Sequence, residues 1–180
     1  MYGRFYRNIS GENKMKSVEI YDNFFDKDQV EMIRRECSGV KFRYGHNYNA
    51  DTPTQGLKGE VEQQHELYLL FKKNLEEVFE YCEDLYSLEI NLIPPSERVY
   101  FTHGAGGGFG RHFIYYCNPN WDLDDCGETQ FWDGKEMITV VPMSNRLVSF
   151  DPALAFKDTS FRDQYKMTVE VRYASDQTAH

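Results

Sequence analysis

The sequence predicts an α+β domain that is mainly β, in which two helices in the N-terminal half support about seven strands. Two observations lead to this prediction. Aromatic residues make up 16% of the chain, with 13 Tyr and 13 Phe, and such side chains pack well on a pleated sheet. After Leu88 the chain becomes a series of short aromatic or β-branched runs separated by Pro, Gly, Asn and Asp, which is typical of a β-sandwich or barrel. The length of 180 residues suits a single domain.

Composition excludes several classes of function. The net charge is −9 and the pI is about 5.0, which argues against general nucleic-acid binding through charge. The chain has no apolar run near the ~20 residues of a membrane span, and its start lacks the apolar core of a secretory signal. The four cysteines are scattered, with no C-x-x-C pair. We therefore expect a reducing, cytoplasmic location and no disulfide framework, zinc ribbon or membrane association.

The first elements are predicted from caps and short apolar runs. Residues 1–16 are polar and are expected to form an N-terminal arm. Val18–Phe24 is the first predicted strand. Asp26 and Gln29 are spaced like a capping box, so a helix should begin there. Gly39 supplies a signal for its end.

The strongest helical pattern lies in the next segment. Phe42–Gly45 is predicted to be a short strand, and residues 46–59 hold so many Asn, Asp, Pro, Thr and Gly that we expect a long loop. From Val61 to Glu83, apolar residues recur at three- and four-residue steps with charges between them. This pattern predicts a helix that packs against one face of a sheet.

The predicted strands of the C-terminal half carry the sequences SLEINLIPP, RVYF, RHFIYYCN, ETQFW, MITVV, NRLVSF and MTVEVRY. No repeat or low-complexity segment interrupts them. We therefore assign residues 17–180 to one domain, with helical support in 24–84 and a β core in 88–173.

The stretch from Phe113 to Tyr173 carries a more specific pattern. It contains FIYYCNPNWDLDDCGETQFW, NRLVSFDPALAF, TSF and KMTVEVRY in this order. It resembles the prolyl-4-hydroxylase-like branch of the 2-oxoglutarate/Fe(II) oxygenases. That resemblance implies a double-stranded β-helix, or jelly-roll, with two supporting N-terminal helices. It also implies a pocket for Fe(II) and 2-oxoglutarate between two sheets.

The resemblance implies an iron site that this chain lacks in part. The family holds iron with two His and one carboxylate, the first two in a His-x-Asp pattern before the Tyr-Tyr strand. His103 matches the first ligand, but Ala105 stands at the carboxylate position. The distal His position, after the Phe-Asp strand, falls on Phe156. The metal site is therefore predicted to be degenerate.

His112 offers an alternative ligand. Side chains alternate along a strand, so His112, Ile114 and Tyr116 should share one face, with Phe113 and Tyr115 on the other. Because the residue matching Tyr116 faces the pocket in the family, His112 should face it too. His112 is then either a hydrogen-bonded pocket residue or a metal ligand together with His103.

The resemblance also implies an anchor for the remote carboxylate of 2-oxoglutarate. The family places an Arg or Lys on the closing strand, and Lys166 matches that position. Tyr116 matches its hydroxyl partner. A lysine can hold a carboxylate as a point charge. The alternative is that Lys166 is a surface lysine at the start of a strand.

These observations favour a pseudoenzyme, with no cofactor, that keeps the oxygenase fold as a binding or structural module for a peptide or protein partner. One alternative is an active 2-oxoglutarate-dependent hydroxylase, using Fe(II), with relocated metal ligands. A halogenase fits Ala105 but not Phe156, because halogenases keep the distal His. The chain also resembles small hydroxylase-like proteins of bacteria and tailed phages, so a place in a phage particle stays open beside a cytoplasmic one.

Overall fold

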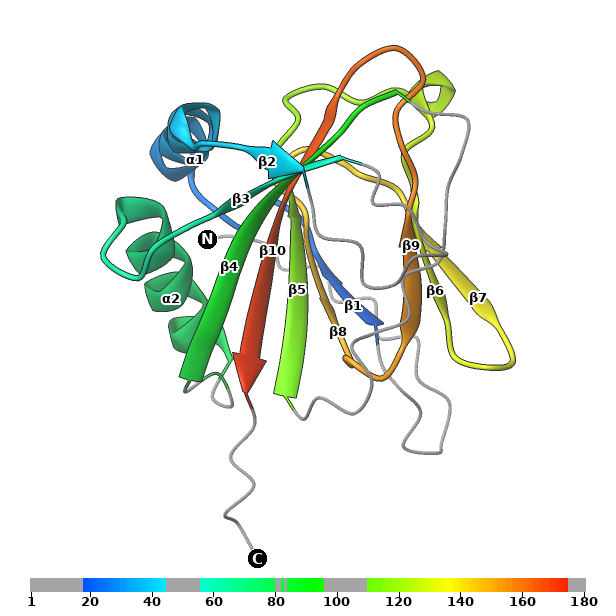
Figure 1. The fold of residues 1–180 in the computed structure, drawn as a ribbon. Helices are drawn as coiled ribbons and strands as arrows, with labels where there is room; N and C mark the ends of the chain where they lie inside the picture. Colours follow the sequence, from blue (N-terminus) through cyan, green and yellow to red (C-terminus); the bar gives the residue numbers. More distant parts are fainter. Residues whose placement is uncertain (1–17, 45–55, 80–81, 83, 96–109, 175–180) are drawn as a thin grey trace, which may run out of the picture.

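Two antiparallel sheets and two helices form three layers in the computed structural model, which describes residues 18–44, 56–79, 82, 84–95 and 110–174. The larger sheet lies in the middle, with both helices on one face and the smaller sheet on the other (Figure 1). In spatial order, the larger sheet contains β1 (Val18–Tyr21), β8 (Leu147–Phe150), β5 (Gly110–Tyr116), β10 (Lys166–Ala174), β4 (Asp84–Ile93), β3 (Leu57–Glu60) and β2 (Arg43–Tyr44). The smaller sheet contains β7 (Met137–Val140), β6 (Thr129–Trp132) and β9 (Ala155–Asp158). This mainly β architecture with two helices is the predicted jelly-roll class.

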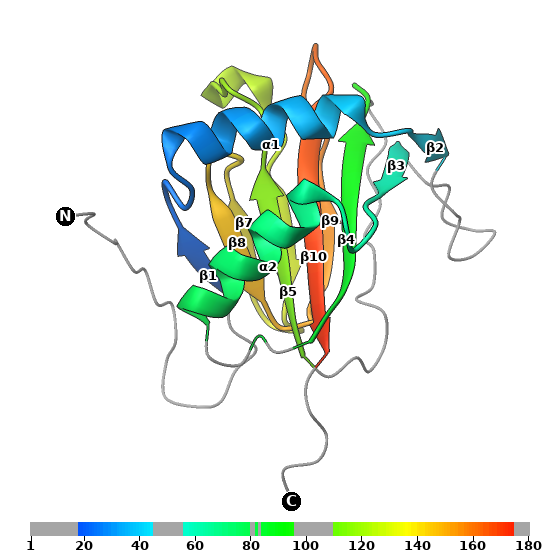
Figure 2. The same cartoon turned by 90° about the vertical axis from the view of Figure 1, so that its left-hand side faces the viewer.

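Helix α1 (Lys27–Gly39) begins and ends where its caps predict. The Gln29 amide donates to Asp26 Oδ1 over 2.8 Å, and the Asp26 amide donates to Gln29 Oε1 over 3.1 Å. This reciprocal capping box satisfies two amides that the helix itself leaves unpaired. The buried residues Val30, Ile33 and Cys37 lie on the face toward the sheet, as Figure 2 shows for the helix as a whole.

Helix α2 (Glu66–Val78) is shorter than the predicted helix at Val61–Glu83. Its N-terminus is set by His65, whose Nδ1 accepts from the Leu67 amide over 3.1 Å. Before it, the Val61 amide donates to the carbonyl of Leu88, so the chain there still follows β4. The apolar periodicity predicts the buried face correctly but overstates the length, because Val61 is buried while the chain still follows β4, before the helix begins.

Two strands were not predicted. Leu57–Gly59 falls within the loop that the sequence predicts at 46–59, yet β3 pairs with β4 over its whole length. Its sequence, LKGE, contains a single large apolar residue, so no alternation marks it. Gly59 is required there because a Cβ would collide with the side chain of Val40. The second missed strand, β9, pairs with β6.

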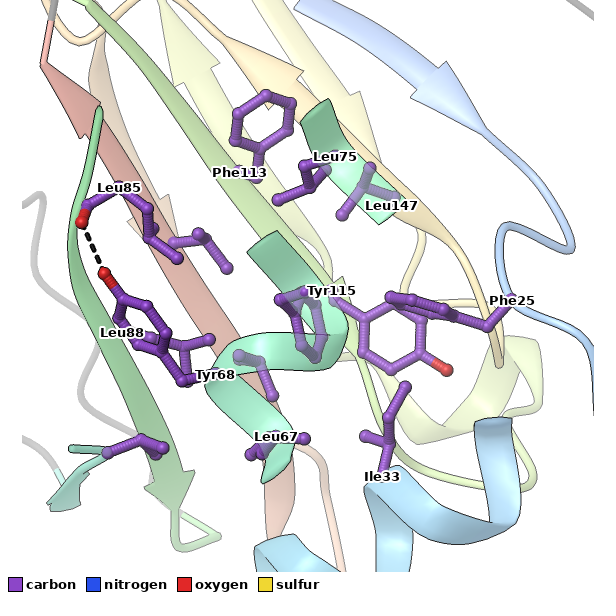
Figure 3. Close-up of a cluster of buried hydrophobic side chains, with 14 of the residues drawn as sticks. Phe25, Ile33, Leu67, Tyr68, Leu75, Leu85, Leu88, Phe113, Tyr115 and Leu147 are labelled. Atoms are coloured by element: carbon purple, nitrogen blue, oxygen red, sulfur yellow. Dashed lines mark hydrogen bonds between the residues drawn. The ribbon is translucent and has the colours of Figure 1, made fainter. Parts of the chain in front are cut away.

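Both faces of the large sheet are buried against a separate hydrophobic core. Phe113 and Tyr115 of β5 point toward the helices, where Tyr115 packs edge-on against Phe25 at a centroid distance of 5.2 Å. Figure 3 shows this cluster, with Tyr115 beside Phe25 and above Ile33 of α1. Ile114 and Tyr116 point to the opposite side, into the core between the two sheets. The predicted alternation along this strand is confirmed.

Several sequence predictions fall on residues outside the described part of the chain. These are the polar arm at 1–16, the strand RVYF at 98–101, His103 and Ala105. Within the described residues, neither α-helix is both long and apolar enough to cross a membrane.

Candidate functional site

Lys166, the first residue of β10, lies fully buried between the two sheets. Its ammonium forms an ion pair with Asp158 Oδ1 and donates to the carbonyl of Gly127 over 2.6 Å. The ring centroid of Tyr116 lies 5.2 Å from Nζ, within the range of a cation–π contact. Lys166 is therefore not the surface lysine of the alternative interpretation. It is buried inside the protein, and its charge is already matched by Asp158.

Tyr116 is the start of a chain of hydrogen bonds that ends on the same carboxylate. Its hydroxyl donates to Thr129 Oγ1 over 2.7 Å, and Thr129 Oγ1 donates to Asp158 Oδ1 over 2.5 Å. Burial, together with the nearby Asp158 carboxylate, raises the pKa of Tyr116 far above its usual value. The phenol thus stays protonated and acts as a hydrogen-bond donor across the physiological range.

The electrostatics of this cluster follow from its burial. Removal from water lowers the pKa of the Lys166 ammonium, and the Asp158 carboxylate acts in the opposite direction. A buried charge is tolerated when it is paired and hydrogen-bonded. Asp158, on β9, supplies that pairing, and 16% of its side chain stays exposed.

Phe156 lies on β9 opposite Phe131 of β6 and packs into the core between the sheets. Its ring centroid is 5.2 Å from that of Phe150 and 6.2 Å from that of Phe131. Phe156 and Asp158, on either side of Lys157 in β9, point to the same face because side chains alternate along a strand. Phe156 and Asp158 therefore both face the larger sheet, where they contact Phe150 and Lys166.

His112 of β5 pairs with Phe150 of β8 across the large sheet, and its side chain is buried, with 5% exposed. Its ring forms a T-shaped contact with the ring of Phe150, at a centroid distance of 5.6 Å and an interplanar angle of 88°. Its Nδ1 has no hydrogen-bond partner among the described residues. Burial lowers the pKa of His112, with Glu170 acting against this effect, so the imidazole is neutral at neutral pH.

The iron ligands predicted by resemblance are not brought together in the described part of the chain. His103 and Ala105 lie outside it, so a joint site of His103 and His112 stays a prediction. Within the described residues, no group of three His, Cys, Asp or Glu side chains converges as metal ligands would. Phe156 itself offers no donor atom.

Sequence reasoning missed the two residues that complete the Lys166 cluster, Asp158 and Thr129. The available signal was spacing: Asp158 stands two residues after Phe156, so on a strand it must share the face of the distal-ligand position. No apolar–polar alternation marks β9 as a strand in the sequence, so this relation is not visible there. Thr129 was not singled out as a site residue, yet it is fully buried.

A second polar group lies on the same face of the large sheet, nearer the β3 edge. Lys58 pairs with Glu89 over 3.0 Å, and Arg172 pairs with Glu170 over 2.8 Å and with Glu89 over 3.4 Å. Asn91 donates to the second oxygen of Glu170 over 3.3 Å. Two cations and two anions thus balance one another across β3, β4 and β10.

No protein-family model and no curated protein sequence matches the chain. Solved structures do match. A prolyl hydroxylase from Trichoplax adhaerens, in complex with a peptide fragment of the hypoxia inducible factor oxygen degradation domain, has a TM-score of 0.73 at 15% identity, over 89% of this chain and 84% of that one. A prolyl-4-hydroxylase from Pseudomonas putida has a TM-score of 0.68 at 15% identity, over 88% and 92%.

A third solved structure extends the likeness beyond prolyl hydroxylases. HygX from Streptomyces hygroscopicus, with nickel, 2-oxoglutarate and hygromycin B bound, has a TM-score of 0.68 at 9% identity, over 91% of this chain and 84% of that one. At these identities the match concerns the fold. The fold of this chain is that of the prolyl hydroxylases and other 2OG-Fe(II) oxygenases, as the motifs after Phe113 predict.

Proposed function

We propose that this protein is a non-catalytic member of the oxygenase fold, which serves as a binding or structural module for a peptide or protein partner. One observation carries the proposal. Phe156 stands at the position that resemblance assigns to the distal iron ligand, and its ring packs against Phe131 and Phe150 between the sheets. Three phenyl rings thus pack together where the resemblance would place a metal ligand.

The residues present do not fit the iron that the fold implies. A facial triad needs three converging donors, and its carboxylate offsets part of the metal charge in a pocket of low dielectric. Phe156 and, in the sequence, Ala105 supply no donor. Nor do they fit 2-oxoglutarate, because the predicted anchor Lys166 is already bonded to Asp158. We therefore derive no reaction step through either group.

The partner is proposed from the fold and the composition. The Trichoplax adhaerens protein with the same fold is described in complex with a peptide fragment, which supports a peptide or protein as the ligand class here. The acidic chain and its scattered cysteines suit a reducing compartment. We assign the protein to the cytoplasm or, if a phage encodes it, to the phage particle.

The competing function is an active 2-oxoglutarate-dependent hydroxylase with relocated ligands. His112 favours it, because a buried imidazole nitrogen without a hydrogen-bond partner is unusual, and a metal ion would give that nitrogen a partner. Under this alternative His103 and His112 hold the iron together. A halogenase is less favoured, since Phe156 replaces the distal His it needs.

An anaerobic titration with Fe(II) and 2-oxoglutarate, followed by a succinate assay, tests the proposal. We expect no stoichiometric iron binding and no succinate above a buffer blank, while the Pseudomonas putida enzyme assayed in parallel gives both. Stoichiometric iron with turnover would overturn the proposal. In that case His112→Gln should abolish iron binding, whereas Trp132→Phe, at an exposed position, should leave it unchanged.

A further inference from the structure

The Asp158 carboxylate occupies a complete carboxylate-binding site made by the protein itself. Lys166 supplies the cation and Thr129 donates a hydroxyl, both to Oδ1 of Asp158. The Tyr116 hydroxyl donates to Thr129 Oγ1 and so orients the Thr129 hydroxyl toward Asp158. The four side chains come from four strands, β5, β6, β9 and β10, so the two sheets together hold the site in place.

Most of the hydrogen-bond donors of the Lys166 ammonium are already used within the protein. It carries three N–H donors, of which one serves Asp158 and one serves the carbonyl of Gly127. The Tyr116 ring lies on a further side of it. An incoming carboxylate would therefore have to displace Asp158 or place a second anion beside the first.

We propose that Asp158 is an intramolecular ligand that permanently fills the carboxylate subsite built by Lys166, Thr129 and Tyr116, and that this subsite admits free small carboxylates only when Asp158 is removed. The inference extends the proposed function to the organic cosubstrate and does not depend on the iron ligands. It assigns to Asp158 the role of a built-in occupant of the subsite around Lys166.

The tethered carboxylate of Asp158 binds Lys166 more favourably than a free carboxylate could. A group on the same chain acts at a high effective concentration, which is in the millimolar range even for flexible tethers. Asp158 is held more firmly, because β9 is paired with β6 along its length. Displacing it would also leave an unpaired carboxylate in a largely buried place, which is unfavourable.

Removal of the occupant is the decisive experiment. In Asp158→Ala, Lys166 loses its counter-ion and a carboxylate-sized space opens toward the partly exposed side of Asp158. We expect a lower melting temperature in chloride buffer and a specific recovery in sodium formate or acetate at constant ionic strength. With a Kd of about 10 mM, about 100 mM formate would raise the folding equilibrium constant about tenfold.

Three matched controls isolate the subsite. The wild type should show no difference between formate and chloride and should give no binding heat with 2-oxoglutarate. Asp158→Asn keeps the space filled by a neutral group, so it should be destabilised without responding to formate. The double variant Asp158→Ala with Lys166→Met has no cation and should not respond either. If Asp158→Ala fails to fold in chloride, recovery of folded protein in formate but not in chloride supports the same inference.

Two results would overturn the inference. One is an Asp158→Ala protein that behaves identically in formate and chloride, whether folded or not. The other is tight 2-oxoglutarate binding by the wild type that is lost in Lys166→Met. Because these measurements use no metal, their outcome is separate from that of the iron titration.

Discussion

Asn145, in the turn before β8, connects three parts of the protein through one side chain. Its backbone has a φ of 58°, in the left-handed region. Its amide group faces the backbone of Phe25 like a strand neighbour, accepting from the Phe25 amide over 3.0 Å and donating to the Phe25 carbonyl over 2.8 Å. The Tyr115 hydroxyl donates to the same oxygen over 3.3 Å. The Asn of the Asn-Arg motif therefore has a structural role.

Two substitutions at Asn145 separate the side chain from the backbone. Asn145→Ala should destabilise the protein by about 3–5 kcal/mol, because it removes these hydrogen bonds and puts Ala, which tolerates positive φ less well than Asn, at this position. Asn145→Gly loses the same bonds but keeps the backbone relaxed, so it should be more stable than the Ala variant by about 1 kcal/mol. Chemical denaturation measures both. Equal stability of the two variants would show that backbone conformation contributes nothing here.

At the scale of elements, adjacent residues of β6 lie on opposite faces of the smaller sheet, one buried and one exposed. Phe131 is fully buried, whereas Trp132 is 40% exposed. Phe131→Ala should cost about 3–5 kcal/mol, because it leaves a cavity beside Phe150. Trp132→Ala should cost no more than about 1 kcal/mol. Thermal melting of the pair tests the strand's register, and the reverse order of the two effects would refute it.

The charged group on β10 predicts a dependence of stability on pH. Burial acts to raise the pKa of Glu170, but Arg172 and Lys58 outweigh it, so the folded-state pKa is lowered. A lowered pKa means that the unfolded chain takes up a proton first. Stability is thus fully present above the unfolded pKa of about 4.3 and is lost as pH falls through the folded value.

Glu170→Gln should flatten this acid limb of the stability curve. One proton accounts for a slope of at most about 1.4 kcal/mol per pH unit. Urea denaturation between about pH 6 and pH 3 measures the slope in the wild type, in Glu170→Gln and in the exposed control Glu136→Gln. A wild-type slope that persists in Glu170→Gln would mean that other carboxyl groups carry the acid sensitivity.

Sequence patterns predicted elements well where the signal is local. The capping box of Asp26 marks the start of α1, and alternation along β5 places Ile114 and Tyr116 in the core between the two sheets. The patterns fail for β3 and β9, because their residues do not alternate between apolar and polar and only pairing marks them as strands. The motifs after Phe113 single out Lys166, which is fully buried, and its role as an anchor stays a prediction. They could not predict its pairing with Asp158, because that contact depends on how β9 packs beside β10.

At the scale of the whole molecule, the large sheet is shared by two cores. Its helix side and its small-sheet side each bury a cluster of apolar residues, and β5 contributes to both. Neither core can lose its packing without exposing the sheet that supports the other. We therefore expect a single cooperative unfolding transition, as is usual for domains of this size.

The positions of the tryptophans make this expectation testable. The two tryptophans of the chain are Trp121 and Trp132. Trp132 lies on β6 of the smaller sheet, and Trp121 donates to the carbonyl of Cys126, in the segment that leads into β6. Their fluorescence should therefore report the small-sheet side, while circular dichroism at about 222 nm reports the helices.

The two unfolding curves should coincide, and Phe71→Leu, in the helix-side core, should shift both equally. We expect a shift of about 2–4 °C for each kcal/mol lost. A helix signal that melts before the fluorescence changes would show that α1 and α2 unfold as a separate unit.

The cysteines of this chain differ sharply in accessibility. Cys37, Cys82 and Cys117 are buried, whereas Cys126 is exposed. Burial raises the pKa of Cys82 to about 12 and that of Cys117 well above its usual value, and alkylation requires the thiolate. A maleimide dye added to the unmodified wild type should thus label one position. That position adjoins Gly127, whose carbonyl bonds Lys166, so the natural sequence already carries a fluorescent reporter site beside the occupied carboxylate subsite.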